Sequence, residues 1–324
     1  MVGGGAGRTR EAPFPRLGGQ PALNPPPTSF PAIEANPSGG RSHWGPPPRS
    51  LLAPHPRAIL AGTMAFERRP LGSGGFALVP TALERAGFLV AFTERGGGAS
   101  AGPFASLNVS QVVGDDPIAV GANRDRIVAG LALGAPFALP EQVHGDRVAR
   151  VDRSNAGAGF DDAADRTAGA DALVTADDGV PVAILTADCL PVAMGSPATG
   201  VLAVVHAGWR GLAAGILARA LEAFNDPGDV LAAIGPAIGP DHYEVGPEVV
   251  DRVTAAADGA ASIDRRDGRT YLDLASTAQG VLRSLGAGRV DVAGLCTACE
   301  ADRFFSHRRD AGSTGRQALV AVRQ

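Results

Sequence analysis

Three side chains that are far apart in the sequence have the chemistry of metal ligands: His144, Cys189 and His206. Cys189 follows the apolar run 180–186 and His206 follows the apolar run 201–205, and both runs have strand character. Because ligands bind at the carboxyl ends of strands in open α/β sheets, we expect the three side chains at one edge of a sheet. Two imidazoles and one thiolate suit zinc, with copper as the soft alternative.

Three protein ligands leave a fourth coordination position open, which is the arrangement of catalytic rather than structural zinc. Water at that position has a pKa of roughly 7 and is a nucleophile at neutral pH. Two other interpretations remain open, since the spacing along the chain is not diagnostic. Each residue could simply pack at a strand end, or Cys189 could be the nucleophile of a cysteine hydrolase with His206 as its base.

The composition excludes several classes of function. The net charge is −4, so neither nucleic acid nor a membrane surface is an expected partner. All 29 basic residues are arginine, which excludes a Schiff-base lysine and a P-loop. Three cysteines cannot form a secreted disulfide framework. No apolar run is long enough for a membrane span or for a signal peptide, so the sequence predicts a cytoplasmic protein.

Proline and glycine divide the chain into parts. Residues 1–63 contain 13 of the 26 prolines, and we expect them to be a disordered extension that takes no part in the chemistry. An over-extended start, with Met64 as the true initiator, is the alternative. Residues 64–87 are expected to be a linker, and residues 88–324 a single catalytic domain.

Strand-like and helical patterns alternate within residues 88–324. The sequence predicts strands at 87–92, 172–175, 180–186, 201–205, 230–234, 290–295 and 317–322, and helices at 117–131, 212–224 and 273–285. This alternation predicts an α/β fold: a layered sandwich with a mixed β-sheet flanked by helices.

Several segments form a specific series in sequence order. Those around the candidate ligands are Gln142-Val143-His144, Thr186-Ala187-Asp188-Cys189 and His206-Ala207-Gly208-Trp209-Arg210-Gly211. The others are Ser106-Leu107-Asn108, Val113-Gly114-Asp115-Asp116 with Asn123-Arg124, Ile234-Gly235-Pro236-Ala237-Ile238-Gly239-Pro240, and Phe304-Phe305-Ser306-His307-Arg308-Arg309-Asp310 with Thr314-Gly315-Arg316. The series covers about residues 88–323. It resembles the multi-copper polyphenol oxidoreductase (laccase) domain family, whose bacterial members are described as purine nucleoside phosphorylases and as a peptidoglycan editing factor.

The resemblance implies an α/β sandwich with zinc held by His144, Cys189 and His206. It also implies purine nucleosides and phosphate as substrates, with phosphorolysis of adenosine, inosine or methylthioadenosine and deamination of adenosine. Such an enzyme is both a glycosyltransferase and a hydrolase. A peptidoglycan-precursor editing enzyme and a polyphenol oxidase are alternatives. A multicopper oxidase, however, needs many more histidines than the four that follow residue 63.

Further residues of these segments are candidates for the site. Asp188 joins Cys189 and His206 as a catalytic candidate: it either carries a proton or is a structural carboxylate that orients a histidine. Arg210 begins a helix after a Gly-rich turn, so positive charge and free N–H groups could bind phosphate there. Arg124 is a weaker phosphate candidate. The amides of Asn108 and Gln142 could hydrogen-bond the base or the ribose.

A second group of residues partly matches the zinc nucleobase-deaminase signature H-x-E…P-C-x-x-C. It consists of His242-Tyr243-Glu244 and Cys296-Thr297-Ala298-Cys299, with Leu295 in place of the proline. A redox pair, a structural site and inert thiols near the cleft are the other interpretations. His307 is expected to line the pocket without binding metal. A non-enzymatic regulator that binds a nucleotide-like ligand is a third hypothesis, and no protein partner is predictable.

Overall fold

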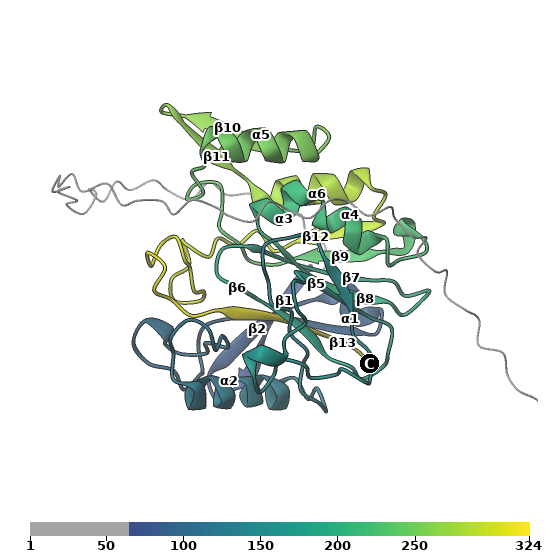
Figure 1. Cartoon of the computed structure of the whole chain (residues 1–324), viewed down its shortest axis with the longest axis vertical. Helices are drawn as coiled ribbons and strands as arrows, with labels where there is room; N and C mark the ends of the chain where they lie inside the picture. Colours follow the sequence, from purple (N-terminus) through teal and green to yellow (C-terminus); the bar gives the residue numbers. More distant parts are fainter. Residues whose placement is uncertain (1–64) are drawn as a thin grey trace, which may run out of the picture. The chain divides into compact units, whose positions relative to one another are not determined.

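Two β-sheets packed face to face form the centre of the computed structural model, which describes residues 65–324 (Figure 1). The antiparallel sheet has the order β1 (Phe66–Gly72), β2 (Gly75–Pro80), β3 (Phe88–Thr93), β13 (Gln317–Arg323), β6 (Val182–Thr186). The mixed sheet has the order β12 (Arg289–Val292), β9 (Leu231–Ile234), β7 (Leu190–Gly195), β8 (Leu202–Ala207), β5 (Ala172–Thr175), β4 (Val148–Arg150). The predicted α/β class with a mixed sheet is confirmed, and the antiparallel sheet is an additional layer.

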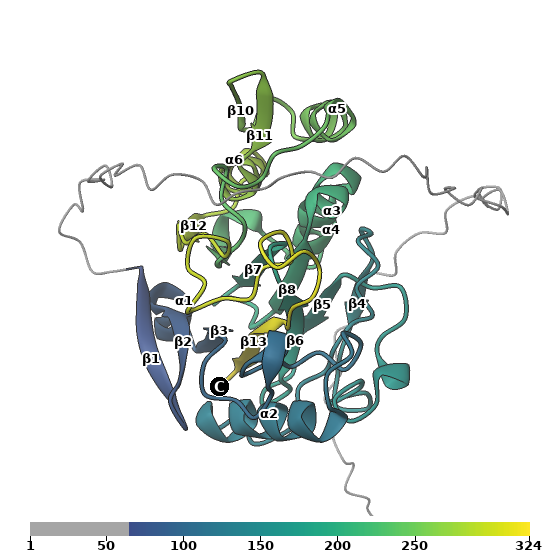
Figure 2. The same cartoon turned by 90° about the vertical axis from the view of Figure 1, so that its left-hand side faces the viewer.

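Helices cover the outer face of each sheet, on opposite sides of the molecule (Figure 2). The antiparallel sheet is covered by α2 (Pro117–Gly130). The mixed sheet is covered by α3 (Trp209–Ala214), α4 (Ile216–Leu221) and α6 (Leu274–Ser284), with α5 (Pro247–Ala256) packed against α3. The remaining elements are α1 (Thr81–Arg85), the hairpin β10 (Ile263–Arg266) and β11 (Arg269–Leu272), and the 3-10 turns Gly102–Phe104, Ala163–Asp165 and Pro227–Asp229. No helix among residues 65–324 combines the length and the apolar character that a membrane span requires.

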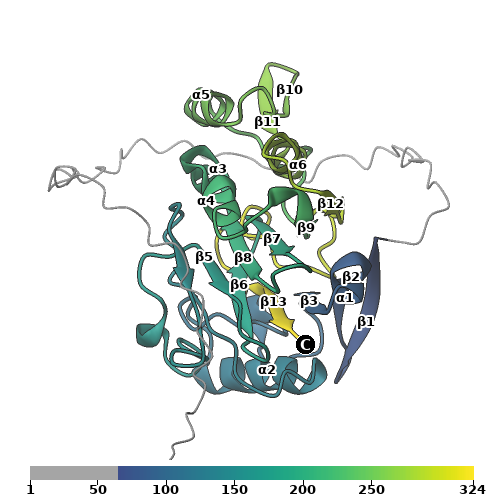
Figure 3. The same ribbon diagram turned by 90° about the vertical axis from the view of Figure 1, so that its right-hand side faces the viewer.

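Apolar side chains from the two sheets fill the space between them. Phe88 and Leu319 come from the antiparallel sheet and Val204 from the mixed sheet, and all three are fully buried. Burying each such side chain contributes roughly 1.5–3 kcal/mol. The last strand, β13, lies between β3 and β6 and is antiparallel to both (Figure 3). The end of the chain is thus part of the core.

The segment 64–87 is not a linker: it contributes two strands and a short helix. β1 pairs with β2, and β2 pairs with β3. β1 is an edge strand with the charged sequence Glu67-Arg68-Arg69, and Arg68 makes two 2.8 Å bonds to Glu94. Charges on an edge strand prevent its pairing with other chains. They also leave β1 without an apolar pattern, which is why the strand was not predicted. The predicted disordered segment 1–63 lies outside the described residues.

The helix predicted at 212–224 is two shorter helices. Gly215 has a φ of +85° and is both the end of α3 and the start of α4. A left-handed glycine ends a helix at little cost, so the chain turns here. Both α3 and α4 contact β8.

Candidate metal centre and active site

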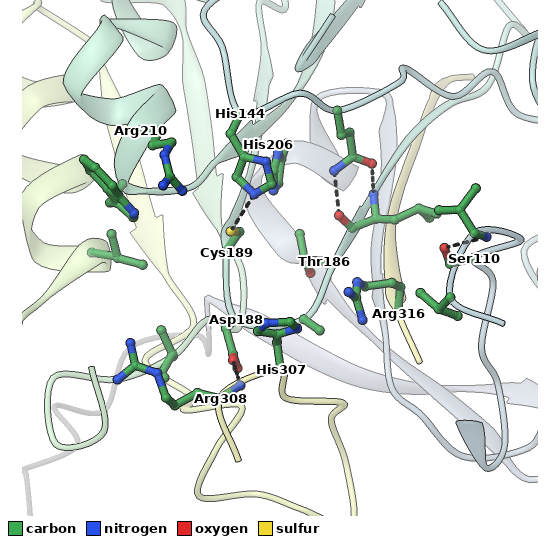
Figure 4. A pocket seen from close by; sticks show the side chains of 18 of the residues that line it. Ser110, His144, Thr186, Asp188, Cys189, His206, Arg210, His307, Arg308 and Arg316 are labelled. Carbon is green, nitrogen blue, oxygen red and sulfur yellow. Dashed lines mark hydrogen bonds between the residues drawn. The ribbon is translucent and has the colours of Figure 1, made fainter. Parts of the chain in front are cut away.

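Cys189 lies where the chain passes from one sheet to the other. Residues 187–189 connect the end of β6 in the antiparallel sheet to the start of β7 in the mixed sheet. Asp188 in this turn has a φ of +91°, which is unfavourable for a residue other than glycine. Its carboxylate accepts bonds from Thr297 Oγ1 at 2.6 Å and from the N–H of Arg308 at 2.7 Å. These bonds hold the turn that presents Cys189 to the pocket (Figure 4).

A fully buried carboxylate, Asp171, positions both histidines. His206 lies in β8, and its Nδ1 is 2.8 Å from Asp171 Oδ1. The same carboxylate accepts the backbone N–H groups of Val143 at 3.1 Å, His144 at 2.9 Å and Gly145 at 2.7 Å. Because Nδ1 of His206 bonds Asp171, Nε2 is the nitrogen left to act as a ligand.

The loop that carries His144 is also tied to β6. The amide of Gln142 donates to the carbonyl of Leu185 at 2.7 Å and accepts its N–H at 2.9 Å. Gln142 and His144 both have a φ of +63°. Such strained residues persist only where their surroundings fix them, and they occur often at functional sites.

His144, Cys189 and His206 come together, with one ligand atom of each lying within 4.8 Å of the others. His144 Nε2 is 3.8 Å from Cys189 Sγ, and the two imidazole rings meet edge to face at 4.8 Å between centroids. Zn–S bonds of about 2.3 Å and Zn–N bonds of about 2.0–2.1 Å at a tetrahedral angle put sulfur and nitrogen about 3.6 Å apart. The three residues are therefore close enough together to hold one metal ion.

Glycine is required beside this cluster. A Cβ atom on Gly208 would lie 2.9 Å from Cys189 Sγ and 3.2 Å from His144 Cδ2. Contacts this short force one side chain to move. Gly208 thus keeps open the space in which the thiol and the imidazole approach each other.

Cys189 and His206 shift each other's pKa in opposite directions. Burial raises the pKa of Cys189, but the charge of His206 and hydrogen bonds from both histidines lower it to about 6. Burial lowers the pKa of His206, but the charge of Cys189 and the bonds to Asp171 and Cys189 raise it to about 9. Without a bound metal ion, the two groups are a thiolate and an imidazolium between these values.

The cluster lies in the wall of a cavity of about 540 Å³. Pockets for small molecules have volumes of about 300–1,000 Å³. Besides the cluster, the lining includes the aromatic residues Trp209 and Tyr243, His307, and four arginines, Arg166, Arg210, Arg308 and Arg316. The cavity therefore combines a cation site with basic and aromatic walls.

Arg166 is unusual among the lining residues. Its Nε and Nη2 atoms are buried and have no hydrogen-bond partner within the described chain. An unpaired buried donor costs about 1–3 kcal/mol, and more when it is charged. Guanidinium groups match the geometry of phosphate and carboxylate oxygens, and Arg166 lines the cavity, which makes it a candidate ligand for an anion.

Three of the other candidate residues line the cavity: Gln142, Asp188 and Arg210. Arg210 lies in the first turn of α3, with its guanidinium 4.6 Å from the ring of Trp209. Asp188 bonds Thr297 and Arg308 rather than a histidine. The carboxylate that orients the histidines is Asp171, so the role of orienting a histidine that was considered for Asp188 belongs to another residue.

Asn108 and Arg124 are not in the lining. Asn108 is fully buried, and its amide bonds Ser110, Asp115 and the N–H of Arg316. Arg124 is fully buried in α2, and its guanidinium donates to the carbonyls of Val109, Gly159 and Phe160. With these hydrogen bonds directed at the protein, the two side chains hold surrounding loops and lie outside the cavity lining.

Three residues of the site had not been singled out. Asp171 had one signal: it directly precedes β5, which pairs with the strand that carries His206. Arg316 had another, because it ends the segment Thr314-Gly315-Arg316 of the series described above. Arg166 follows an irregular 3-10 turn, and no pattern marked it.

This chain is similar to known proteins over most of its length. Residues 89–324 match the family model for multi-copper polyphenol oxidoreductase laccase. A purine nucleoside phosphorylase from Deinococcus radiodurans is 42% identical over 235 residues, which are 71% of this chain and 87% of that protein. The purine nucleoside phosphorylase YlmD from Geobacillus stearothermophilus is 39% identical over 252 residues, which are 74% of this chain and 91% of that protein.

Solved structures show the same fold. The crystal structure of YlmD from Geobacillus stearothermophilus is similar with a TM-score of 0.73 and 36% identity, covering 80% of this chain and 99% of that one. The crystal structure of the Bacillus licheniformis hypothetical protein YfiH has a TM-score of 0.74 and 30% identity, covering 81% of this chain and 100% of that one. From the match over most of its length, the chain belongs to the multi-copper polyphenol oxidoreductase laccase family.

Proposed function

We propose that this chain is a zinc-dependent purine nucleoside phosphorylase that also deaminates adenosine and cleaves methylthioadenosine. The observation that carries the proposal is the cavity itself, in which two imidazoles and a thiol converge on one wall and arginines line the remainder. The relatives that are named purine nucleoside phosphorylase support it, because they match this chain over almost their whole length.

Phosphate recognition is assigned to the arginines of the cavity. Arg166 has buried donors without partners, and Arg316 lines the same cavity. Arg210 lies at the opening turn of α3, as expected for a phosphate ligand. Guanidinium forks bind phosphate oxygens in pairs and hold a phosphate in one orientation. These three residues replace Arg124, which bonds only the protein.

The base and the ribose are assigned to the remaining walls. Trp209 and Tyr243 offer flat apolar surfaces on which a purine can stack. Gln142 holds the loop of His144 through Leu185, so it acts on the position of a metal ligand as well as on the shape of the cavity.

His144, Cys189 and His206 would hold the zinc ion, which would supply a Lewis acid for the negative charge that develops in either reaction. Asp171 keeps the ring of His206 in one orientation and directs its Nε2 toward the cluster. In phosphorolysis, a phosphate oxygen bonds to C1′ of the ribose while the bond from C1′ to N9 of the purine breaks. The purine then leaves with the electron pair and takes up a proton.

A cysteine hydrolase is the second candidate, and one specific observation favours it. Cys189, His206 and Asp171 have the relationship of nucleophile, base and orienting carboxylate, with a 2.8 Å bond between the last two. A thiol of pKa about 6 beside an imidazole of pKa about 9 has the charges of a reactive cysteine pair. A cysteine hydrolase keeps its activity after metal removal, whereas a zinc phosphorylase loses it.

The proposal is tested by incubating the zinc-loaded chain with inosine, adenosine or methylthioadenosine in the presence and absence of phosphate. We expect free base and the ribose 1-phosphate ester only with phosphate, and inosine from adenosine under both conditions. Activity is expected to disappear with a chelator, to return with zinc, and to be absent from Cys189→Ala. Products at the same rate from the wild type and from Cys189→Ala would rule the proposal out.

A further inference from the structure

A second group of metal-binding side chains lies outside the cavity and consists of His242, Cys296 and Cys299. One ligand atom of each lies within 4.8 Å of the others. His242 and Cys299 are exposed and Cys296 is half-buried, and the cavity lining includes none of the three. This cluster, the surface cluster, is therefore open to solvent and separate from the candidate active site.

The distances within the surface cluster match those around a tetrahedral ion. His242 Nδ1 lies 3.5 Å from Cys299 Sγ and 3.8 Å from Cys296 Sγ. A tetrahedral zinc site has sulfur and nitrogen about 3.6 Å apart. Two cysteines separated by two residues, together with a distant histidine, are also the usual ligand pattern of zinc sites.

The surroundings of the sulfur atoms agree with a thiolate ligand. The backbone N–H of Gly239 points at Cys296 Sγ at 3.1 Å. Hydrogen bonds of this kind orient ligands and stabilise their charge in metal sites. A Cβ atom on Gly239 would come within 3.1 Å of Cys296 Cβ and 3.2 Å of its Sγ. The chain therefore brings an N–H donor close to this sulfur at a position that has no side chain.

We propose that the surface cluster is a second metal site, which binds zinc through His242 Nδ1 and two thiolates and completes its tetrahedron with water. It would join the segment that follows β9 to the segment that precedes β13. These segments already meet at a bridge between Ala237 and Cys296 and through a bond from Thr297 N to the carbonyl of Ala237 at 3.0 Å. A metal ion bound here would add coordination bonds to the few hydrogen bonds that join the two segments.

The two joined segments also form part of the cavity wall. Tyr243, next to His242, lines the cavity. Thr297, next to Cys296, donates to Asp188, which neighbours Cys189. The guanidinium of Arg308 donates to the carbonyl of His242 at 3.3 Å. Zinc in the surface cluster would therefore stabilise the wall of the active site without touching the substrate.

The role assigned to this site is structural rather than catalytic. The deaminase signature uses its glutamate as the general acid and base beside the metal. Here the side chain of Glu244 lies 3.4 Å from Arg269 in β11 and is not a member of the cluster. The surface cluster shares the ligand types of that signature and lacks its proton carrier.

The test compares the full-length wild type with variants, all reduced and freed of metal. Cys189→Ala removes a ligand of the cluster in the cavity, and Cys299→Ser removes a ligand of the surface cluster. Cobalt(II), a spectroscopic substitute for zinc, is titrated and bound metal is counted. We expect two ions per wild-type chain, one in Cys189→Ala and one in Cys299→Ser. Two thiolates bind the remaining ion in Cys189→Ala, whereas one thiolate binds the remaining ion in Cys299→Ser. The thiolate-to-cobalt absorption per bound ion should therefore be about twice as strong in Cys189→Ala as in Cys299→Ser. Asp302→Asn, which changes an exposed residue of the same segment, should still bind two.

Thermal unfolding gives an independent measurement of the same site. With zinc at about 100 times its dissociation constant, the melting temperature of Cys189→Ala should rise by about 5–10 °C. The double variant Cys189→Ala with Cys299→Ser should show no rise. Circular dichroism establishes that each variant is folded before metal is added. The proposal is overturned if reduced, folded Cys189→Ala binds no stoichiometric ion, or if Cys299→Ser leaves the count at two. Neither result depends on phosphorylase activity.

Discussion

Replacing Asp171 by asparagine tests the arrangement that holds the candidate metal centre. The carboxylate accepts four hydrogen bonds and is fully buried. Oδ1 takes those of His206 and His144, and Oδ2 takes those of Val143 and Gly145. Asparagine has the same shape but only one oxygen. In either orientation of the amide, two N–H donors would face an NH2 group instead of an acceptor.

The size of the effect follows from these bonds. A hydrogen bond to a charged group contributes about 1.5–3 kcal/mol, so the loss of two lowers the free energy of unfolding by about 3–6 kcal/mol. Globular proteins have about 5–15 kcal/mol in total. The orientation of the histidines is also relaxed, and losing such an outer contact typically weakens metal binding by about 10–100-fold.

Asp188→Asn is the matched control. Asp188 also has a buried carboxylate and neighbours Cys189. An asparagine at this position can keep both of its hydrogen-bond partners. Oδ1 can accept the N–H of Arg308, and Nδ2 can donate to Thr297 Oγ1. We therefore expect the control to bind zinc with less than about a threefold loss, well below the outer-contact range.

Urea unfolding measures the stability of both variants, and competition with a chromophoric chelator measures their zinc affinity. Both measurements use a Cys299→Ser background, so that a single type of site is titrated. The reasoning is refuted if folded Asp171→Asn binds zinc as tightly as its parent, or if Asp188→Asn loses as much affinity as Asp171→Asn.

Three further predictions concern reactivity, phosphate and space. In metal-free protein, the rate of Cys189 alkylation should rise with pH around a midpoint of about 6, because only the thiolate reacts. Cys299 has a pKa raised to about 11, mainly by burial, and should react slowly at neutral pH. Mass mapping of the two thiols checks this, and a Cys189 midpoint near the ordinary value of about 8.5 contradicts it. Arg166→Met should raise KM for phosphate about 10–100-fold through lost charged hydrogen bonds, with little change in KM for the nucleoside; equal changes in both constants would argue against a phosphate role. Gly208→Ala should weaken zinc binding by pushing the thiol of Cys189 away. The control Gly121→Ala in α2, where a Cβ meets nothing within 4 Å, should leave zinc binding unchanged and raise the free energy of unfolding by about 0.5–1 kcal/mol. A Gly208→Ala protein that binds zinc normally would contradict the crowding at Cys189.

The sequence was most informative where apolar strands end in chemically distinctive residues. The strand 172–175 is found at the predicted residues. β8 (Leu202–Ala207) overlaps the predicted strand 201–205 and carries His206 near its end. Fully buried strands must be continuously apolar, so they stand out from polar surroundings. Histidine and cysteine are rare in this chain, and their positions at strand ends led to the cluster that the structure brings together.

Other features could not be predicted because their cause is tertiary. β1 carries charges because it lies at an edge, and its sequence resembles a polar linker. Arg124 was expected to bind phosphate because it lies in one of the segments that carry the family resemblance. In the structure, three backbone carbonyls of distant loops accept the hydrogen bonds of its guanidinium. Asp171 directly precedes a predicted strand, but its role arises only when His206 and the loop of His144 fold around it.

The surface cluster illustrates the same limit. Between His242 and the two cysteines the chain forms α5, the β10–β11 hairpin, α6 and β12. The match to a known signature was partial, and spacing along the chain says little about distance in space. The bridge between Ala237 and Cys296 and the hydrogen bonds around it bring the two segments together.

Anomalous diffraction at the zinc absorption edge, from crystals of the zinc-loaded chain, tests the central claim most directly. We expect a strong peak within about 2.0–2.3 Å of His144 Nε2, His206 Nε2 and Cys189 Sγ, with the fourth direction facing the cavity. An empty map at these three atoms, in crystals that bind zinc elsewhere, would contradict the account of the site.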